Sequence, residues 1–197
     1  MTSVDGVPAG FKYPGAIDWL LLTGGRSSRL GQDKASTSIA GRTMLERSLA
    51  AIEQVEPGAR VRELGAQFSG GPAAAVVAAL PQCSSQFVGV VAVDMPLVRA
   101  ALTVVVDSLD PANLEVDAWI PVTAQGRRQW LSALYRRESL QRVASDEDFR
   151  DRPFHELVGE LSVVEVTVPA DVSLSDVDTP ADLERAIAQV EESERAR

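Results

Sequence analysis

A loop rich in glycine and basic residues follows the first apolar segment of the chain. In the sequence LLTGGRSSRLGQDKA, glycines stand close to three cations: Gly24, Gly25, Arg26, Arg29 and Lys34. Backbone amides can approach an anion closely where no side chain intervenes. Cations offset the charge that builds up on a departing pyrophosphate. The loop therefore predicts a polyphosphate-binding site, with Arg29 and Lys34 as catalytic cations.

Two well-known glycine loops are excluded by counting. A P-loop has four residues between its glycines and a Lys directly after the second glycine. Here five residues separate Gly25 from Gly31, and two more precede Lys34. The Gly-x-Gly-x-x-Gly pattern of dinucleotide-binding folds does not occur in the sequence. A tight turn with solvated charges stays open as the alternative interpretation.

A carboxylate follows a second apolar segment, FVGVVAV at residues 87–93, which ends at Asp94. The carboxyl ends of parallel strands lie along one edge of a sheet, so we expect Asp94 near the glycine loop. One carboxylate with open positions for water and phosphate oxygens is a common way to hold magnesium. The alternative role for Asp94 is to stabilise the positive end of the helix that follows Pro96.

A second acidic pair, Asp176 and Asp178, lies near the end of the chain. Residues two apart in an extended segment point to the same side. The pair could complete the metal site, with Asp178 as the second ligand, or contact an acceptor. A polar lead-in to a helix capped by Thr179 is the competing interpretation.

Basic residues flank a turn expected at Gln125 and Gly126: Arg127, Arg128, Arg136 and Arg137. They could bind an anionic acceptor, although charges beside a turn are commonly solvated. Trp130 could stack on a ring or pack half-buried against the core.

Strand-like and helix-like segments alternate over most of the chain. We expect strands at residues 16–23, 87–93 and 161–168, and a short strand could form at 60–64. Residues 117–122 and 129–136 suit a strand pair around a turn, with longer helices as the alternative. We expect helices at residues 42–55, 73–80, 97–109 and from about 180 onward. This alternation predicts a three-layer α/β/α fold with a mostly parallel, Rossmann-like sheet. Residues 16–188 would form one domain, between a flexible lead-in at 1–15 and a fraying tail at 189–197.

Composition excludes several classes of protein. The formal net charge of -9 argues against a basic face for nucleic acid. Cys83 and His155 are each the only residue of their type, which excludes an intrachain disulfide and a zinc site built from Cys and His. No apolar run approaches the ~18 residues of a membrane span, and no export signal is recognisable. We therefore expect a cytoplasmic protein that does not enter a membrane.

Four segments in order, LLTGGRSSRLGQDKA, GGPAAAVVAAL, VVAVDMPLV and DVDTPADLERA, resemble the molybdenum cofactor guanylyltransferase family over about residues 17–188. Taken singly, only the first segment is specific to this family. The occurrence of all four in the same order makes the resemblance much more specific. The resemblance implies the nucleotide-diphospho-sugar transferase type of the Rossmann-like fold. It implies nucleotide contacts from Leu22, Thr23, Gly24, Gly25, Ser27, Lys34, Glu63, Gly71 and Asp94.

The reaction implied by this resemblance joins GMP from GTP to the terminal phosphate of molybdopterin, with Mg²⁺ held by Asp94. Proteins that deliver or accept the molybdenum cofactor are the implied partners. The chain departs from the family pattern between residues 55 and 70, where a second strand that leads to the base contact looks shortened or lost. A cytidylyltransferase, another nucleotidyltransferase with a different phosphorylated acceptor, and a nucleotide-binding module without catalysis therefore remain as alternatives.

Overall fold

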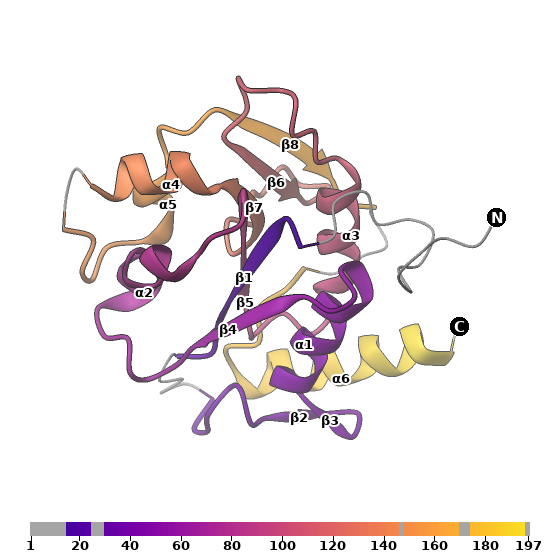
Figure 1. Cartoon of the computed structure of the whole chain (residues 1–197). Coiled ribbons are helices and arrows are strands. Elements are labelled where there is room, and N and C mark those ends of the chain that lie inside the picture. The colour runs from indigo at the N-terminus through magenta and orange to yellow at the C-terminus, as the bar shows by residue number, and fades with distance from the viewer. Residues whose placement is uncertain (1–14, 25–29, 146–147, 170–173, 196–197) are drawn as a thin grey trace.

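In the computed structural model of the chain, which describes residues 15–24, 30–145, 148–169 and 174–195, six strands form the main sheet (Figure 1). In spatial order the sheet is β4-β1-β5-β7-β6-β8. The strands are β1 (Ile17–Leu22), β4 (Arg60–Leu64), β5 (Phe87–Ala92), β6 (Ala118–Val122), β7 (Ser132–Arg136) and β8 (Val163–Thr167). Strand β7 pairs antiparallel with β5 and β6, whereas the other neighbouring strands pair in parallel. The predicted, mostly parallel sheet is confirmed.

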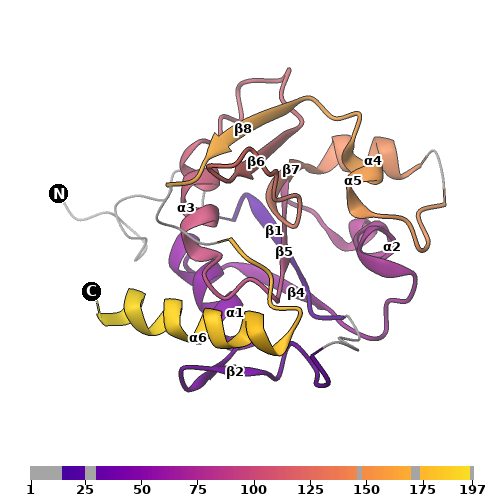
Figure 2. The same ribbon diagram turned by 180° about the vertical axis from the view of Figure 1, so that it is seen from behind.

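Helices cover both faces of this sheet, as Figures 1 and 2 show from opposite sides. One layer holds α1 (Met44–Val55), α3 (Arg99–Asp107) and α6 (Pro180–Arg195). The other holds α2 (Gly71–Ala79), α4 (Arg137–Ala144) and α5 (Phe154–Val158), with a short 3-10 turn at Leu80–Gln82. A small hairpin of β2 (Ser38–Ile39) and β3 (Arg42–Thr43) lies beside α6. None of the helices in the part of the chain described here is long and apolar enough to cross a membrane.

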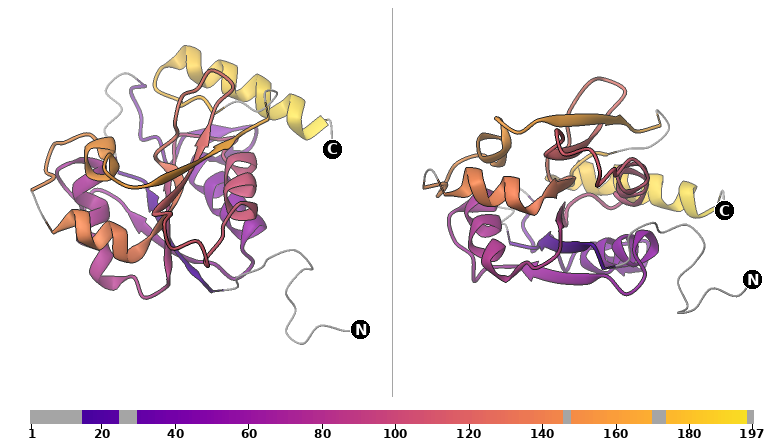
Figure 3. Two further views of the ribbon diagram at one scale, coloured as in Figure 1. Left: turned by 90° about the horizontal axis from the view of Figure 1, so that it is seen from above. Right: turned by 45° about the horizontal axis from the view of Figure 1, so that its top comes forward.

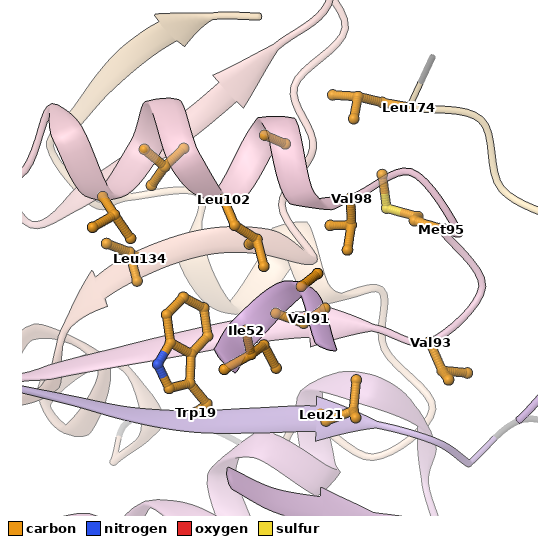
Figure 4. Packing of buried hydrophobic residues seen from close by; sticks show 14 of the residues in the cluster. Trp19, Leu21, Ile52, Val91, Val93, Met95, Val98, Leu102, Leu134 and Leu174 are labelled. Atoms are coloured by element: carbon orange, nitrogen blue, oxygen red, sulfur yellow. The ribbon is translucent and has the colours of Figure 1, made fainter. Parts of the chain in front are cut away.

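Strand β1 explains why both faces are covered. Its side chains alternate between two apolar clusters: Trp19 and Leu21 face the layer of α1, and Leu20 and Leu22 face the layer of α2. A strand with apolar residues on both faces is stable only when each face is buried. Figure 4 shows the first cluster, in which Trp19 lies beside Ile52.

Strand β4 forms at residues 60–64, where the sequence allowed a short strand, so the second strand is not lost. It pairs in parallel with β1 along its whole length, from Arg60 opposite Asp18 to Leu64 opposite Leu22. Because β4 lies at the edge of the sheet, its sequence is largely polar, and Leu64 is the residue that it buries fully. The polar sequence weakened the strand signal without removing the strand.

Helices α1, α2 and α3 differ from their predicted bounds by one or two residues at an end, and the predicted fraying tail is largely helical. Helix α1 begins at Met44, because residues 42 and 43 pair as β3, and Thr43 and Glu46 form a capping box at its start. Helix α6 continues past residue 188 to Arg195, since Val190 is buried in the core and Glu194 pairs with Arg47. The predicted lead-in lies outside the described residues, apart from residue 15. Figure 3 shows α6 running along the outside of the sheet.

Gly89 in β5 should be irreplaceable, because a Cβ there would lie 2.3 Å from Cε3 of the Trp19 ring. Trp19 is fully buried and cannot move away, so we expect Gly89→Ala to lower the free energy of unfolding by about 2 kcal/mol or more. Urea unfolding measures this change. In a Trp19→Leu background the same substitution should cost much less, and an equal cost in both backgrounds would refute the packing argument.

Candidate active site

Three backbone hydrogen bonds bring distant segments together at the carboxyl edge of the sheet. The Val93 amide donates to the Leu22 carbonyl (3.1 Å), which joins the ends of β1 and β5. The Ala92 amide donates to the Leu131 carbonyl (2.8 Å), which holds the segment before β7 against β5. The Val177 amide donates to the Asp94 carbonyl (2.9 Å), which places the segment between β8 and α6 at the same edge.

Lys34 and two carboxylates form the charged centre of this edge. The Lys34 ammonium lies 2.6 Å from Asp94 Oδ2 and 2.6 Å from Asp178 Oδ1. Lys34 is largely buried, with 13% of its side chain exposed, whereas 47% of the Asp178 side chain is exposed. Burial alone lowers the pKa of Lys34, but the hydrogen bonds to Asp178 and Asp94 outweigh it and raise that pKa above its ordinary value. Lys34 is therefore a fully charged ammonium at neutral pH.

A tight turn positions Lys34. The Thr37 amide donates to the Lys34 carbonyl (3.1 Å), and the Thr37 hydroxyl donates to the Asp33 carbonyl (2.8 Å). The first two amides of α1 hold this turn against the helix: the Met44 amide donates to the Thr37 carbonyl, and the Leu45 amide donates to the Ala35 carbonyl. The start of α1 thus fixes the turn from which Lys34 reaches Asp94.

Asp176 adds a third carboxylate, on the same side of its segment as Asp178. Its Oδ2 accepts from the Arg127 guanidinium at 3.3 Å, while Val177 between the two acids is buried. Burial, and next the charge of Asp94, raise the pKa of Asp176 above its ordinary value, although Arg127 opposes them. Figure 4 shows Leu174, which anchors this segment, near Met95 and Val98. The predicted alternation of the acidic pair is therefore present, with the apolar residue between the two acids inserted into the core.

The glycine loop differs from the expected amide cradle. The Thr23 and Gly24 amides both donate to the Leu64 carbonyl, at 3.1 and 3.0 Å, so neither is free for an anion in this conformation. A Cβ on Gly24 would lie 3.0 Å from the Gly65 carbonyl oxygen, so Gly24 is required here by close packing against β4. Gly25, Ser27 and Arg29, which were also predicted to bind the nucleotide or to act in catalysis, lie outside the described residues.

Glu63 and Gly71, the other predicted nucleotide contacts, flank the loop between β4 and α2. Glu63 is an exposed residue one position before the end of β4. Gly71 begins α2 with a φ of 84°, and a Cβ there would meet no atom within 4 Å. Both residues therefore border open space at the carboxyl edge, where the positive end of α2 favours an anion.

The four arginines predicted to bind an acceptor separate into two pairs. Arg127 and Arg128 lie at the carboxyl edge, where they pair with Asp176 and Glu165. Arg136 is buried over the rings of Phe87 and Trp119, and Arg137 donates to the Ser85 carbonyl. Because β7 runs opposite to β5, Arg136 and Arg137 lie at the far edge of the sheet and have structural roles. These two therefore do not lie where an acceptor could meet Asp94, which excludes for them one of the two interpretations left open by the sequence.

A pocket of about 240 Å³ opens beside Asp94. Residues from α2, the end of β5, the β6–β7 connection, α5 and the acidic segment line it: Pro72, Ala92, Asp94, Met95, Arg127, Arg128, Gln129, Trp130, Leu131, Phe154, His155 and Asp176. Asp94 therefore belongs both to the charged centre with Lys34 and to the wall of this pocket. Two ligands could meet at this carboxylate.

The carboxylates of Asp94 and Asp178 suit a magnesium ion. They already converge on one cationic nitrogen, and magnesium in proteins is usually held by one or two carboxylates together with water and phosphate oxygens. Within the described ranges, no group of three or more His, Cys, Asp or Glu side chains is arranged to hold a metal ion. A metal here would therefore need oxygens from a bound phosphate.

Comparison with known proteins decides the family. The sequence matches the family described as the MobA-like NTP transferase domain over residues 19–156. The chain belongs to this family. It is 30% identical over 184 residues to a protein of Mycobacterium marinum named probable molybdenum cofactor guanylyltransferase, covering 83% of this chain and 90% of that protein. The resemblance found in the sequence is confirmed.

Solved structures show how widely this fold is used. The molybdopterin-guanine dinucleotide biosynthesis protein A of Archaeoglobus fulgidus has a TM-score of 0.59 and 20% identity, covering 89% of this chain and 99% of its own. The 4-diphosphocytidyl-2C-methyl-D-erythritol synthase of Anaerococcus prevotii has a TM-score of 0.65 and 12% identity, and the match covers 89% of this chain and 96% of that protein. At these identities the likeness concerns the fold, which is shared by enzymes named for different nucleotides.

Sequence reasoning named the acids and the lysine of the site but missed part of the pocket. Gln129 and His155 both line it, yet neither stands in a pattern that indicates a ligand. The bridging position of Lys34 between two carboxylates was also not foreseen, because it depends on a contact across 144 residues of chain. Only the fold brings these residues together.

Lys34 should stabilise the free protein as well as serve the site. Lys34→Met leaves the Asp94 and Asp178 carboxylates without their cation, and we expect the free energy of unfolding to fall by about 1–2 kcal/mol, since solvent screens part of the repulsion. Adding Asp178→Asn should recover part of this loss, and Lys34→Arg should lose less. Urea unfolding of this double-mutant cycle measures the coupling, and strictly additive losses would contradict it.

Proposed function

We propose that this chain transfers GMP from GTP to the terminal phosphate of molybdopterin and releases pyrophosphate. The observation that supports this most is the Lys34 ammonium at 2.6 Å from both Asp94 and Asp178. It joins a cation suited to phosphate with two carboxylates suited to magnesium at the carboxyl edge, where open α/β sheets bind ligands. The substrates of the proposal follow the name of the Mycobacterium marinum relative.

Magnesium fits Asp94 and Asp178, which would hold it through their carboxylates; when bound, it neutralises charge on the phosphates and orients them. Lys34 would donate to a phosphate oxygen of the nucleotide, which is the role that suits its ammonium at this edge of the sheet. The predicted Arg29 would add a second cation from the glycine loop. The positive end of α2, at Gly71 and Pro72, adds a further favourable field for the phosphates.

The chemistry needs no general base from the protein. An oxygen of the acceptor phosphate attacks the α-phosphorus of GTP, the bond from that phosphorus to the oxygen bridging the β-phosphate breaks, and pyrophosphate leaves with the electron pair. A phosphate monoester with a second pKa near 6 is already anionic at neutral pH, so no proton must be removed from the nucleophile. The work of the side chains is to position two polyanions in line and to screen their repulsion.

Replacing either Lys34 or Asp94 should strongly reduce turnover. With GTP, Mg²⁺ and molybdopterin, we expect Lys34→Ala and Asp94→Ala each to reduce kcat at least about 100-fold, as removal of one group that stabilises transition-state charge does. Pyrophosphate release measures the rate. The exposed residues Arg99 and Asp107 on α3 provide matched controls of each charge, and their alanine variants should keep full activity.

The same assay separates the competing functions. Release of pyrophosphate with CTP but not with GTP would contradict guanylyl transfer and favour a cytidylyltransferase. Absence of turnover with any triphosphate, together with calorimetry in which Mg²⁺ does not change triphosphate binding, would favour a nucleotide-binding module. Unchanged turnover in folded Lys34→Ala or Asp94→Ala would overturn the proposed site itself.

The metal requirement should depend on Asp178. Because Asp178 supplies one of two carboxylates, Asp178→Asn should raise the Mg²⁺ concentration for half-maximal activity by roughly tenfold. The KM for GTP at saturating Mg²⁺ should change far less. Titrating Mg²⁺ at fixed GTP and acceptor tests this, with Asp107→Asn as the control. An unchanged Mg²⁺ titration in Asp178→Asn would remove this residue from the metal site.

A further inference from the structure

The pocket beside Asp94 borders strands that lie beyond β1 in the sheet, on the side away from β4. The loop follows β1 and contacts the end of β4, through the amides that donate to Leu64. The pocket instead borders β5, the β6–β7 connection and α5. Helices α2 and α5, which contribute Pro72 and His155, lie next to one another on this face (Figures 1 and 2). Asp94 follows β5, the strand between β1 and β7, so a nucleotide at the end of β1 and a second ligand in the pocket could both reach it.

Trp130 gives the pocket a flat aromatic wall. Trp130 is partly exposed, whereas Trp19 and Trp119 are 0% and 1% exposed. Its backbone carbonyl accepts a 2.6 Å hydrogen bond from the Tyr135 hydroxyl, and its side chain packs against the cluster that contains Phe154. The ring is therefore held in place while it borders the pocket, as a stacking platform requires.

Gln129 supplies an unused hydrogen-bonding group in the same wall. The residue is only 7% exposed, but among the described residues Ser48 Oγ, and not the Gln129 amide, is the buried side-chain atom without a partner. The Gln129 backbone is fixed, since its amide donates to the Pro121 carbonyl (2.9 Å). The side-chain amide of Gln129 therefore reaches the open space of the pocket, where it offers both a donor and an acceptor. The group therefore suits a ligand that presents a complementary polar edge.

Cations complete the rim of the pocket. The Arg128 guanidinium lies 5.3 Å from the centre of the Trp130 ring and pairs with Glu165, and both partners of that pair are substantially exposed. An exposed ion pair holds its members weakly, so Arg128 can turn to an incoming anion. Arg127 lies on the rim next to Asp176. A ligand that carries a phosphate is favoured here over a neutral one.

We propose that this pocket holds the ring system of the acceptor: a planar heterocycle that stacks on Trp130, bonds to the Gln129 amide and directs its phosphate past Arg127 and Arg128 to Asp94. The volume of about 240 Å³ is below the roughly 300–1,000 Å³ of typical small-molecule sites, so it fits one fused ring system rather than a dinucleotide. This assignment rests on the proposed function, because a nucleotidyl acceptor must reach the α-phosphorus held near Asp94.

Fluorescence of Trp130 allows the acceptor site to be measured without turnover. Of the three tryptophans, Trp130 is the one that a ligand can contact, so a phosphorylated pterin should quench emission of the wild-type protein in the absence of nucleotide. We expect Trp130→Ala to weaken pterin binding about ten- to hundredfold, as loss of one stacked base does. Calorimetry measures the affinity where the fluorophore is removed. Trp130→Phe, which keeps a ring, should lose less than about fivefold.

Gln129→Leu should weaken pterin binding about tenfold, and Arg128→Ala should act more strongly on phosphorylated than on unphosphorylated pterin. GTP affinity should stay within twofold in all of these variants. Arg142→Ala, an exposed arginine on α4, is the matched control. Thermal unfolding of each variant verifies that it is folded.

The outcomes distinguish this site from the proposed function. Pterin binding that depends on Trp130 in a protein without guanylyl transfer would support the pocket and refute the proposed reaction. Guanylyl transfer with a pterin affinity that Trp130→Ala and Gln129→Leu leave unchanged would refute the pocket alone. A loss of GTP affinity in these variants, with pterin affinity retained, would assign the pocket to the nucleotide and overturn the inference.

Discussion

The site depends on one ammonium group that balances two carboxylates. Asp94 and Asp178 come from opposite halves of the chain and would repel each other and Asp176 if the Lys34 ammonium were not 2.6 Å from both. The same three charges are the ones that a metal-bound triphosphate can use. A phosphate can take Lys34, and a divalent cation can take the carboxylates, so that charge balance is kept when ligands bind. Stability of the free protein and readiness for substrate thus rest on the same contact.

The backbone explains how this contact is reached. Parallel strands β1 and β5 end together, and the Val93 amide locks their ends through the Leu22 carbonyl. The buried Val177 anchors the acidic segment to the Asp94 carbonyl, which leaves the residues on either side of it at the site. The charged groups are therefore held by apolar packing and by hydrogen bonds to main-chain carbonyls. Because these contacts involve no other charged group, they fix the positions of the carboxylates without adding charge to the site.

Much of this arrangement is predictable from sequence, and the reasons are local. The apolar runs of β1 and β5, the capping boxes at Thr43 and Thr179, and the position of Asp94 after a buried strand are all visible in short windows. What failed depends on tertiary contacts. Edge strand β4 gives only a weak strand pattern in the sequence, because its exposed side chains are polar. The Thr23 and Gly24 amides donate to the Leu64 carbonyl, so they do not form the open anion-binding loop that the glycines predicted. The sequence could not show whether Arg136 and Arg137 face an acceptor, because this depends on the direction of β7, which places them at the far edge of the sheet.

A crystal structure with Mg²⁺ and a GTP analogue that cannot be cleaved between the α- and β-phosphates would test the central claim most directly. We expect the Lys34 ammonium to leave at least one carboxylate and contact a phosphate oxygen, with Mg²⁺ held between the phosphates and the carboxylates of Asp94 and Asp178. A nucleotide bound elsewhere, or bound with Lys34 still on both carboxylates and the metal away from Asp94, would contradict it.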